Sequence, residues 1–360
     1  MKPDMITARQ LTALSLFSLL PQAGGLFAAL TAERAGVAGW LAPLPAVLPA
    51  LGALFLLQAL YRRHPDAPLD RIVLSALGPV AGRAFLGLAA LWCLLRGALV
   101  LRLHGARGVE LLFPRTHPAG LMLLLLLVTL RAARGRLSVL SRAGVLCLLL
   151  VSVGLLLLWL PALPSARLMP FLPAEPADAT RLLQGAWPLA ALFGFAVLTN
   201  FLSGQVDDRT NTGRRSVPPL LLCAGATALL LLFSYQVFGA ALAARMPEPF
   251  PAAAGSLSGP GGTARLAPFV LSLWSLCDFL HLALTSLTAM SLLGAVTGRT
   301  NLRPLAIPLH VLLFLGALVI PLGSTDLRAL ATVLLPWGDG LLAFGLPPLL
   351  YLADRLRRKL

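Results

Sequence analysis

The chain has 360 residues, of which 58% are hydrophobic and only 12% are charged, and its mean hydropathy is +0.85. Too few polar residues are present to cover a water-soluble globule, so the composition indicates a protein that has the lipid bilayer as its solvent. The formal charge of +15 does not indicate nucleic-acid binding, because the basic residues gather in loops between apolar segments, as membrane topology requires.

Apolar segments of about 18 to 25 residues, the length that crosses a ~30 Å hydrocarbon core, follow one another along the chain. We therefore predict an all-α membrane protein with a single integral domain over residues 1–360. Its ten transmembrane helices are predicted at residues 8–31, 38–61, 84–103, 118–131, 140–161, 182–203, 217–242, 267–296, 304–322 and 333–353.

The first segment is long, is interrupted by Pro21 and lacks a convincing cleavage site before Glu33. We expect it to remain as the first span, not to be removed as a signal peptide. With the N-terminus in the cytoplasm, about twice as many basic residues lie inside as outside, which predicts that both termini are cytoplasmic.

The four cysteines are widely spaced within apolar segments, which suits neither metal ligation nor a disulfide framework. No clustered nucleophile and base can be identified, and no glycine-rich phosphate loop is present. We therefore expect no metal, no cofactor and no enzymatic activity.

Ten spans divide into two halves of five, over residues 8–161 and 182–353. An odd number of spans inverts the second half in the membrane, as in the inverted-topology repeats of secondary transporters. Helix-breaking residues interrupt the first span of each half: Pro21 to Gly25 in span 1, and Trp187-Pro188 followed by Phe193-Gly194-Phe195 in span 6.

Unwound backbone at this depth is tolerated only where it is buried in protein or lines a wet cavity. Half-helix N-termini would attract an anionic group such as an amino-acid carboxylate, and the freed carbonyls would accept from an ammonium group or hold a cation. The alternative is that these glycines and prolines serve close packing or a simple kink.

Ionisable groups inside spans usually face the bundle interior or a transport pathway. Arg96 lies in the middle of span 3, with either a structural or a functional role. Span 8 carries a polar stripe on one helix face, formed by Asp278, His281, Thr285 and Thr288. It either supports interhelical hydrogen bonds or lines a substrate or ion path. Asp278 could pair with a cation such as Arg96, and Asp339 is expected at a shallow, partly hydrated start of span 10.

Four stretches carry a family resemblance: Ile6 to Leu11, Glu33 to Gly36 with Trp40-Leu41, Arg62 to Pro65 with Leu77-Gly78, and Leu168 to Phe171. They resemble the spore germination permease family, the GerAB-type B subunits of germinant receptors, within the amino acid-polyamine-organocation superfamily. The resemblance implies a LeuT-like 5+5 inverted repeat with broken helices 1 and 6. It also implies residence in the inner membrane of a bacterial spore, and assembly with an A subunit and a lipoprotein C subunit.

The resemblance further implies that a small germinant, typically an amino acid, binds between spans 1 and 6. Carried over by position and joined by Gln22 and Asn200 beside the same breaks, the predicted ligand-binding residues are Gln22, Gly24, Gly25, Phe193, Gly194, Phe195, Thr199 and Asn200. A polar pathway or coupling group is predicted at Arg96, Asp278, His281 and Thr285.

The sequence departs from the family at two places. Span 6 has Phe195-Ala196-Val197 where many relatives carry an acidic residue, and span 5 has no lysine to stand in for a coupling cation. We expect a ligand-sensing subunit that does no chemistry. The alternative is an autonomous amino-acid transporter coupled to protons or sodium, in which Thr285 and Ser286 could contribute to a sodium site. The fold alone does not separate the two.

Overall fold

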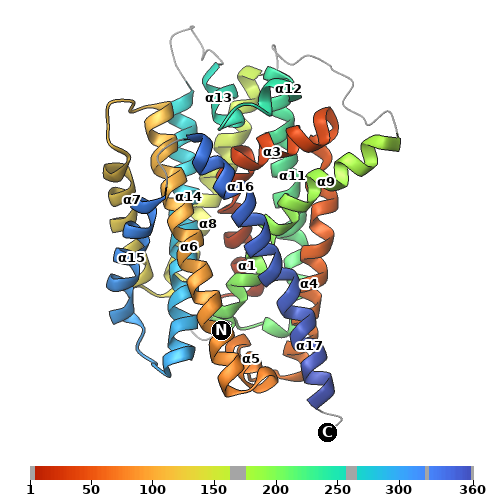
Figure 1. Cartoon of the computed structure of the whole chain (residues 1–360), viewed down its shortest axis with the longest axis vertical. Coiled ribbons are helices and arrows are strands. Elements are labelled where there is room, and N and C mark those ends of the chain that lie inside the picture. The colour runs from red at the N-terminus through yellow and green to blue at the C-terminus, as the bar shows by residue number, and fades with distance from the viewer. Residues whose placement is uncertain (1–4, 163–175, 257–265, 321–323, 358–360) are drawn as a thin grey trace.

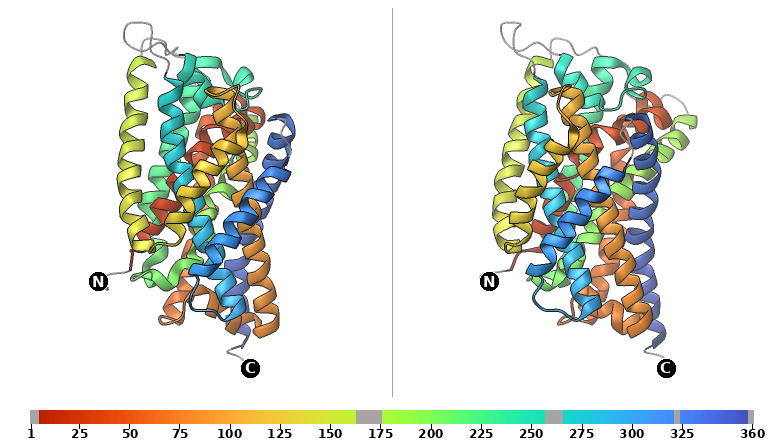
Figure 2. Two further views of the ribbon diagram at one scale, coloured as in Figure 1. Left: turned by 90° about the vertical axis from the view of Figure 1, so that its left-hand side faces the viewer. Right: turned by 60° about the vertical axis from the view of Figure 1, so that its left-hand side comes forward.

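Apolar helices make up most of the chain in the computed structural model, which describes residues 5–162, 176–256, 266–320 and 324–357. No β-strand occurs in these ranges, although an isolated bridge pairs Ile6 with Val206. The first and last described residues lie toward the same end of the bundle, called here the terminal end (Figures 1 and 2). The opposite end is called the distal end. The stretch Leu168 to Phe171 lies outside the described residues.

Seven described segments are long and apolar enough to cross a membrane. They are α4 (Pro43–Arg63), α6 (Pro79–Leu111), α8 (Leu137–Ala162), α9 (Pro176–Phe193) with α10 (Phe195–Leu198) and the 3-10 helix Thr199–Gln205, α11 (Thr212–Phe238), α14 (Ala267–Thr297), and α16 (Ser324–Gly340) with α17 (Leu346–Arg357). A π-helical turn, Leu341–Gly345, joins α16 to α17.

A bent helix pair raises the number of candidate spans to eight. Its first part comprises α1 (Ala8–Phe17) and α2 (Leu20–Gly24), and its second comprises α3 (Leu26–Ala35) and the 3-10 helix Gly36–Leu41. Two shorter apolar helices, α7 (Pro118–Ala133) and α15 (Ala306–Val319), lie where the fourth and ninth spans were predicted. The remaining short helices are α5 (Leu69–Leu77), α12 (Ala240–Ala243) and α13 (Pro249–Ser256).

Glycine and proline define several helix boundaries. Gly78 has a φ of 87°, and Pro79 follows it as the first residue of α6, a position where a missing N–H leaves no helical hydrogen bond unmade. Gly298 ends α14 in the left-handed conformation, with a φ of 71°. These local signals set the start of α6 and the end of α14.

The lateral surface of the bundle is apolar, whereas polar side chains are buried within it. On α8, for example, Leu146, Leu149 and Leu156 are 61% to 66% exposed. Exposed leucines in such number are suited to contact with lipid tails. Helices α6 and α14 pack against each other inside this surface (Figure 1) and supply most of the buried ionisable groups.

The first predicted break is confirmed, because the helix pair on either side of Gly25 is bent by 65°. The second is milder than predicted, since residues 178–205 form one candidate span. At Gly194, hydrogen bonds continue through the interruption: its N–H donates to the carbonyls of Ala190 and Ala191, and its carbonyl accepts from Val197. The chain therefore tightens into a 3-10 helix and does not unwind.

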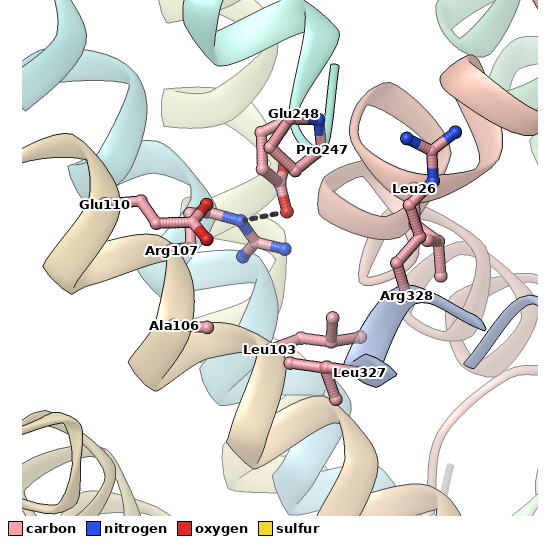
Figure 3. A pocket seen from close by; sticks show the side chains of 9 residues that line it. All are labelled: Leu26, Leu103, Ala106, Arg107, Glu110, Pro247, Glu248, Leu327 and Arg328. Atoms are coloured by element: carbon pink, nitrogen blue, oxygen red, sulfur yellow. Dashed lines mark ion pairs between the residues drawn. The ribbon is translucent and has the colours of Figure 1, made fainter. Parts of the chain in front are cut away.

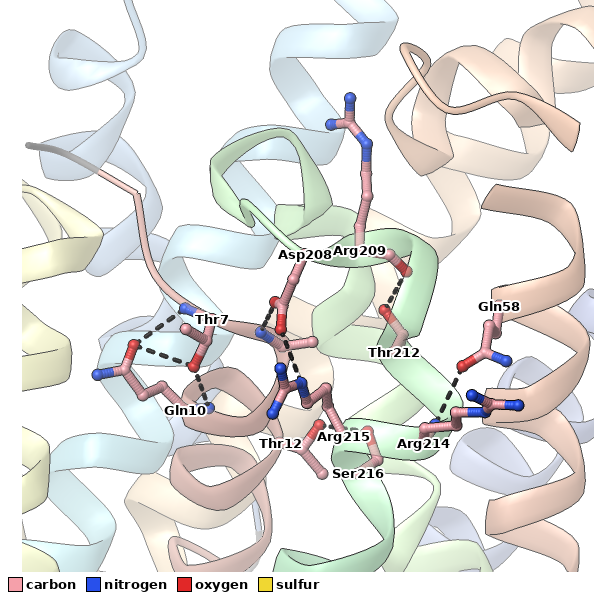
Figure 4. Close-up of polar contacts among 11 residues, drawn as sticks. Thr7, Gln10, Thr12, Gln58, Asp208, Arg209, Thr212, Arg214, Arg215 and Ser216 are labelled. Carbon is pink, nitrogen blue, oxygen red and sulfur yellow. Dashed lines mark hydrogen bonds and ion pairs between the residues drawn. The ribbon is translucent and has the colours of Figure 1, made fainter. Parts of the chain in front are cut away.

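The start of α1 is attached to the loop that follows the second interrupted segment (Figure 4). The Ala8 N–H donates to Asp208 Oδ1 at 2.6 Å, and Arg215 Nε lies 3.3 Å from Asp208 Oδ2. The backbone of Ile6 also pairs with that of Gln205 and Asp207. Segments about 200 residues apart in sequence are therefore held together at the terminal end.

Candidate functional site

The first helix break places Gly25 against the carboxylate of Glu248, which lies in the connection between α12 and α13. A Cβ on Gly25 would collide with Glu248 Oε2, so only glycine allows this approach. A Cβ on the neighbouring Gly24 would lie 3.2 Å from the Trp274 ring. That ring stacks on Phe250, with centroids 5.3 Å apart. The break is thus enclosed by one carboxylate and an aromatic pair.

Four buried ionisable side chains meet beside this break and are called here the distal charge cluster: His104, Arg107, Glu248 and Asp278. Arg107 Nε lies 3.1 Å from Glu248 Oε1, and its Nη1 lies 2.8 Å from Asp278 Oδ2. His104 Nδ1 is 2.9 Å from the same Asp278 oxygen. All four side chains are at most 10% exposed. Arg107 pairs with both carboxylates. When both are ionised, one arginine does not neutralise them, so a further positive charge would be electrostatically favourable here.

Burial raises the pKa of Glu248 to about 7, because a carboxylate loses hydration in this position. The Arg107 guanidinium opposes this rise through its charge and its hydrogen bond. Glu248 lies outside the candidate spans, in a connection at the distal end. The carboxyl group can therefore change its charge near neutral pH.

Several buried polar atoms around the break have no hydrogen-bond partner among the described residues. They are both amide atoms of Gln22, Glu248 Oε2, Trp274 Nε1 and Asp278 Oδ1. Buried polar atoms are nearly always satisfied in folded proteins, so such a group of exceptions requires an explanation. These atoms include donors and acceptors, so each of them could form a hydrogen bond with a small polar molecule.

A small cavity adjoins the distal charge cluster and is shown in Figure 3. It encloses about 20 Å³, which is room for about one water molecule. Its lining residues are Leu26, Leu103, Ala106, Arg107, Glu110, Pro247, Glu248, Leu327 and Arg328. Arg328 donates to the carbonyls of Ala244 and Met246, so α16 is linked to the segment that carries Glu248. A larger molecule would enter only if these elements moved apart.

A second buried ion pair joins Arg96 on α6 to Asp339 on α16. The Trp92 indole N–H donates to the other Asp339 oxygen at 2.9 Å. Two predictions are corrected here. Asp339 is 2% exposed and not at a hydrated helix start, and Arg96 pairs with Asp339, whereas Asp278 pairs with Arg107. Helix α16 packs against α9, and this contact buries Asp339. The sequence does not reveal this contact, because the two helices are far apart along the chain.

Phe195 connects this ion pair to the polar face of α14. The Arg96 guanidinium carbon lies 4.5 Å from the Phe195 ring centroid. The centroid of the His281 ring lies 4.3 Å from the same Phe195 centroid, with the two ring planes tilted by 32°. His281 Nδ1 is in turn 3.1 Å from Ser18 Oγ, next to the end of α1. The glycine at position 194 allows the backbone beside Phe195 to lie close to Ala343, since a Cβ on Gly194 would lie 2.5 Å from the Ala343 Cβ.

The remaining predicted residues are buried in the protein core. Phe193 is fully buried in the core. Thr199 Oγ1 is 2.8 Å from Ser15 Oγ, and Asn200 donates its side-chain amide to the Ala196 carbonyl. Thr285 Oγ1 is buried and has no partner in the described part of the chain.

The predicted residues thus form two groups. Gln22, Gly24 and Gly25 lie at the first break, where Gly25 contacts Glu248 of the distal charge cluster that also contains Asp278. Phe195, His281 and Arg96 meet near Gly194. Sequence reasoning missed Glu248, Arg107 and Trp274. Arg107 was assigned to a loop because span 3 was predicted to end at residue 103, whereas α6 continues to Leu111. Its spacing from Arg96, eleven residues or about three helical turns, was the available signal.

These features define a polytopic all-α membrane protein with an interrupted first span and ionisable groups buried between its helices. The chain matches the model of the spore germination permease family, described as spore germination protein, over residues 5–321. Because this match covers most of the chain, the protein belongs to that family. No curated protein matches the chain. The family match ends before α16, so Asp339 and Arg328 lie beyond it.

Proposed function

We propose that this protein is the germinant-sensing membrane subunit of a spore germination receptor, and that it binds an amino acid within the membrane. Membership of the spore germination permease family supports a germination-related, permease-like membrane protein. The proposed location is the spore inner membrane, with both termini in the cytoplasm, as the positive-inside bias favours. The distal end then faces outward.

The proposed fold is the LeuT-like 5+5 inverted repeat. In this arrangement α7 and α15 cross the membrane with the eight longer candidates, and the two halves begin with the interrupted segments. The bend at Gly25 and the interruption at Gly194 support this proposal.

The group of unpartnered polar atoms at the first break is the observation that carries the proposed function. The oxygens Glu248 Oε2 and Asp278 Oδ1 suit an ammonium group. The amide of Gln22 and the N-terminus of α3, whose first N–H groups lack intrahelical partners, suit a carboxylate. An amino acid presents both groups on one carbon atom. The ligand would thus lie nearer to the α14 face than the predicted site between spans 1 and 6.

Sensing requires a ligand with different affinities for two arrangements of the bundle. The cavity is too small for an amino acid, so binding would favour an arrangement in which α16 and the α12–α13 connection lie further apart. The A and C subunits of the receptor would then respond to that change. No chemical step is required of this chain.

Reconstitution in liposomes tests this function directly. Binding and uptake of a panel of tritiated amino acids would be measured with and without sodium and proton gradients. We expect saturable binding without accumulation. We also expect Gly24→Leu to abolish binding, since the new side chain would meet Trp274 and Phe250, while Gly87→Leu serves as control because open space surrounds Gly87. Normal binding by the Gly24 variant would refute the site.

Secondary transport is the alternative, and one observation favours it. The hydroxyls of Thr285 and Ser286 are buried without partners in the described ranges, whereas membrane-helix hydroxyls usually bond their own backbone. Both could contribute to a coupling-cation site. Gradient-driven accumulation of an amino acid in the same liposomes would establish transport and contradict the proposed role as a sensor that does not transport its ligand.

A further inference from the structure

Two tryptophans are exposed on the lateral surface of the bundle, where α9 and α16 meet. These helices pack against each other, and α16 runs across the front of the bundle in Figure 1. Trp187 of α9 is 39% exposed, and Trp337 of α16 is 60% exposed. Their rings meet edge to face, with centroids 6.3 Å apart. This aromatic pair belongs to neither group of predicted site residues.

Exposed apolar side chains extend the pair along both helices. Leu183 lies one helical turn before Trp187, while Val333 and Leu341 lie one turn before and one turn after Trp337. These five residues are called here the tryptophan face. Their side chains carry two polar groups, the indole N–H groups, and both are donors.

The tryptophan face lies at the depth of the hydrocarbon core. Trp187 is four to five residues from the midpoint of its candidate span, residues 178–205, and Trp337 is four residues from the midpoint of its span, residues 326–356. Four residues of helix correspond to roughly 6 Å. A core of ~30 Å extends about 15 Å to either side of its centre, so both indoles lie well inside it.

At this depth the two indole N–H groups need acceptors. Trp92, whose ring lies against Gly338, donates its N–H to Asp339 Oδ1 at 2.9 Å. In contrast, Trp187 and Trp337 have no acceptor within hydrogen-bond distance among the described residues. Lipid tails offer none, whereas tryptophans at the membrane surface meet water and headgroups. A covering molecule with an acceptor would therefore be favoured here.

We propose that the tryptophan face binds a transmembrane helix of another protein, and that this helix carries a hydrogen-bond acceptor in its middle turns. The acceptor would be the side chain of a glutamine, asparagine, serine or threonine. Exposed tryptophans are typical anchors of protein interfaces, and polar side chains that bond across helices stabilise helix pairs in membranes.

The donor-only chemistry of the face argues against two other occupants. Two copies of this chain joined through the face, about an axis along the membrane normal, would place each side chain at its own depth and oppose donor to donor. A phospholipid has its acceptors at the depth of the headgroups and presents only apolar tails to Trp187 and Trp337.

A helix bound here would rest on the second interrupted segment. Gly340 lies beneath Trp187, since a Cβ on Gly340 would be 3.3 Å from that ring. The Phe344 ring of the π-helical turn is 5.9 Å from Trp187 between centroids, and Ala343 of the same turn lies against Gly194. A change at Gly194 would therefore alter the contacts beneath the face. The proposal concerns a separate surface and holds whether the chain senses or transports its ligand.

Fluorescence quenching tests the depth of the face. The purified chain would be reconstituted in phosphatidylcholine that carries a nitroxide quencher either near the methyl end of its acyl chain or next to its headgroup. The emission that the double variant Trp187→Phe/Trp337→Phe removes should be quenched more strongly by the deep label. Stronger quenching by the shallow label would overturn the proposal, because water and headgroups would then satisfy both N–H groups.

Photocross-linking in the native membrane tests the occupant. Benzoylphenylalanine would replace Leu341 in the face or, as a matched control, Leu149 of α8, which are 69% and 61% exposed. From position 341 we expect a cross-link, mapped by mass spectrometry, to an apolar segment of another protein, within two helical turns of an acceptor side chain. Position 149 should not reach that segment. Cross-links from position 341 to lipid alone, to a second copy of this chain, or to a helix without an acceptor would each overturn the proposal.

Single variants test the two donors. Trp187→Phe and Trp337→Phe each keep an aromatic ring and remove one N–H group. Each should weaken the association by about threefold, as expected for one hydrogen bond between membrane helices, measured from the position 341 cross-link at low expression of both chains. Leu146→Phe on α8 should have no effect, and melting temperatures would confirm that all variants fold. Unchanged association in both tryptophan variants would overturn the proposal.

Discussion

The imidazole of His281 lies against the ring of Phe195, with centroids 4.3 Å apart and planes inclined by 32°. Because His281 also contacts Ser18, one side chain of α14 touches both interrupted segments. A change of angle at either segment would alter a contact of His281. This contact gives a physical basis for communication between the first helix break and the Arg96–Asp339 pair on the other side of Phe195.

Asp339→Asn tests the energetic role of that buried pair. We expect the free energy of unfolding to fall by about 3 to 5 kcal/mol, because Arg96 would keep its charge with no carboxylate beside it. Thermal unfolding in detergent would measure the loss, and Asp66→Asn at an exposed position should have little effect. The double variant Arg96→Met/Asp339→Leu should recover most of the stability. A double variant as unstable as the single one would contradict the electrostatic explanation.

Gln22→Leu separates a structural from a ligand-binding role for this amide. Leaving a buried amide without partners costs about 1 to 3 kcal/mol, so the variant should be at least as stable as the natural chain. It should nevertheless lose binding of the amino acid identified in the liposome panel. Melting temperature and binding are measured on the same sample. A strong loss of stability would show that Gln22 has a structural partner in the folded protein.

The Glu248 carboxyl group predicts a pH dependence of binding. Its pKa is raised to about 7 by burial, so the group is largely protonated at about pH 6 and ionised at about pH 8. Affinity for an ammonium-bearing ligand should rise over this interval. Glu248→Gln should remove most of that dependence, whereas Glu33→Gln, at an exposed position, should not. Identical pH profiles for Glu248→Gln and the natural chain would exclude Glu248 from the site.

The same group contributes to the pH dependence of stability with a defined sign. Because its pKa in the folded protein exceeds the ordinary value of 4.5, the folded state holds the proton more tightly than the unfolded state. The stabilising contribution is full below about pH 4.5 and is lost as the pH rises through about 7. Unfolding scans should therefore give the natural chain and Glu248→Gln their most similar stabilities at low pH, where Glu248 is protonated. The difference in stability between them should grow as the pH rises through about 7.

Asp208→Ala tests the attachment of α1 at the terminal end. Loss of the charge-assisted bond from the Ala8 N–H should lower the free energy of unfolding by about 1 to 2 kcal/mol. Asp207→Ala is the matched control, because the Asp207 side chain is exposed and the hydrogen bond from Asp207 to the Ile6 carbonyl uses the backbone N–H. Equal melting temperatures for the two variants would show that the Asp208 carboxylate adds nothing to the attachment.

The long helices could be predicted from the sequence because their signals are local. Hydrophobic length indicates each long helix, while Pro79 marks the start of α6 and Gly298 marks the end of α14. The bend at Gly25 was predicted for the same reason, since Pro21 and two glycines weaken one short stretch. At Gly194 the same reasoning overestimated the effect, because one glycine flanked by good hydrogen-bonding partners does not unwind a helix.

The partners of buried charges could not be predicted, because they depend on contacts between distant segments. Arg96 and Asp339 are 243 residues apart, and Arg107 and Asp278 are 171 residues apart. The sequence shows that each charge needs a partner but not which one is near. Glu248 was missed for a related reason, since a carboxylate in a loop is usually solvated and only the fold places this one against Gly25.

The bond between Asp208 and the Ala8 amide, with the Ile6 bridge beside it, fastens the first interrupted helix to the loop after the second. Both helices therefore share a fixed pivot at the terminal end. Rotation about such a pivot gives the smallest displacement beside it and the largest at the far end, where Glu248 and Arg328 lie. A modest tilt could open the small distal cavity while the terminal surface kept its shape.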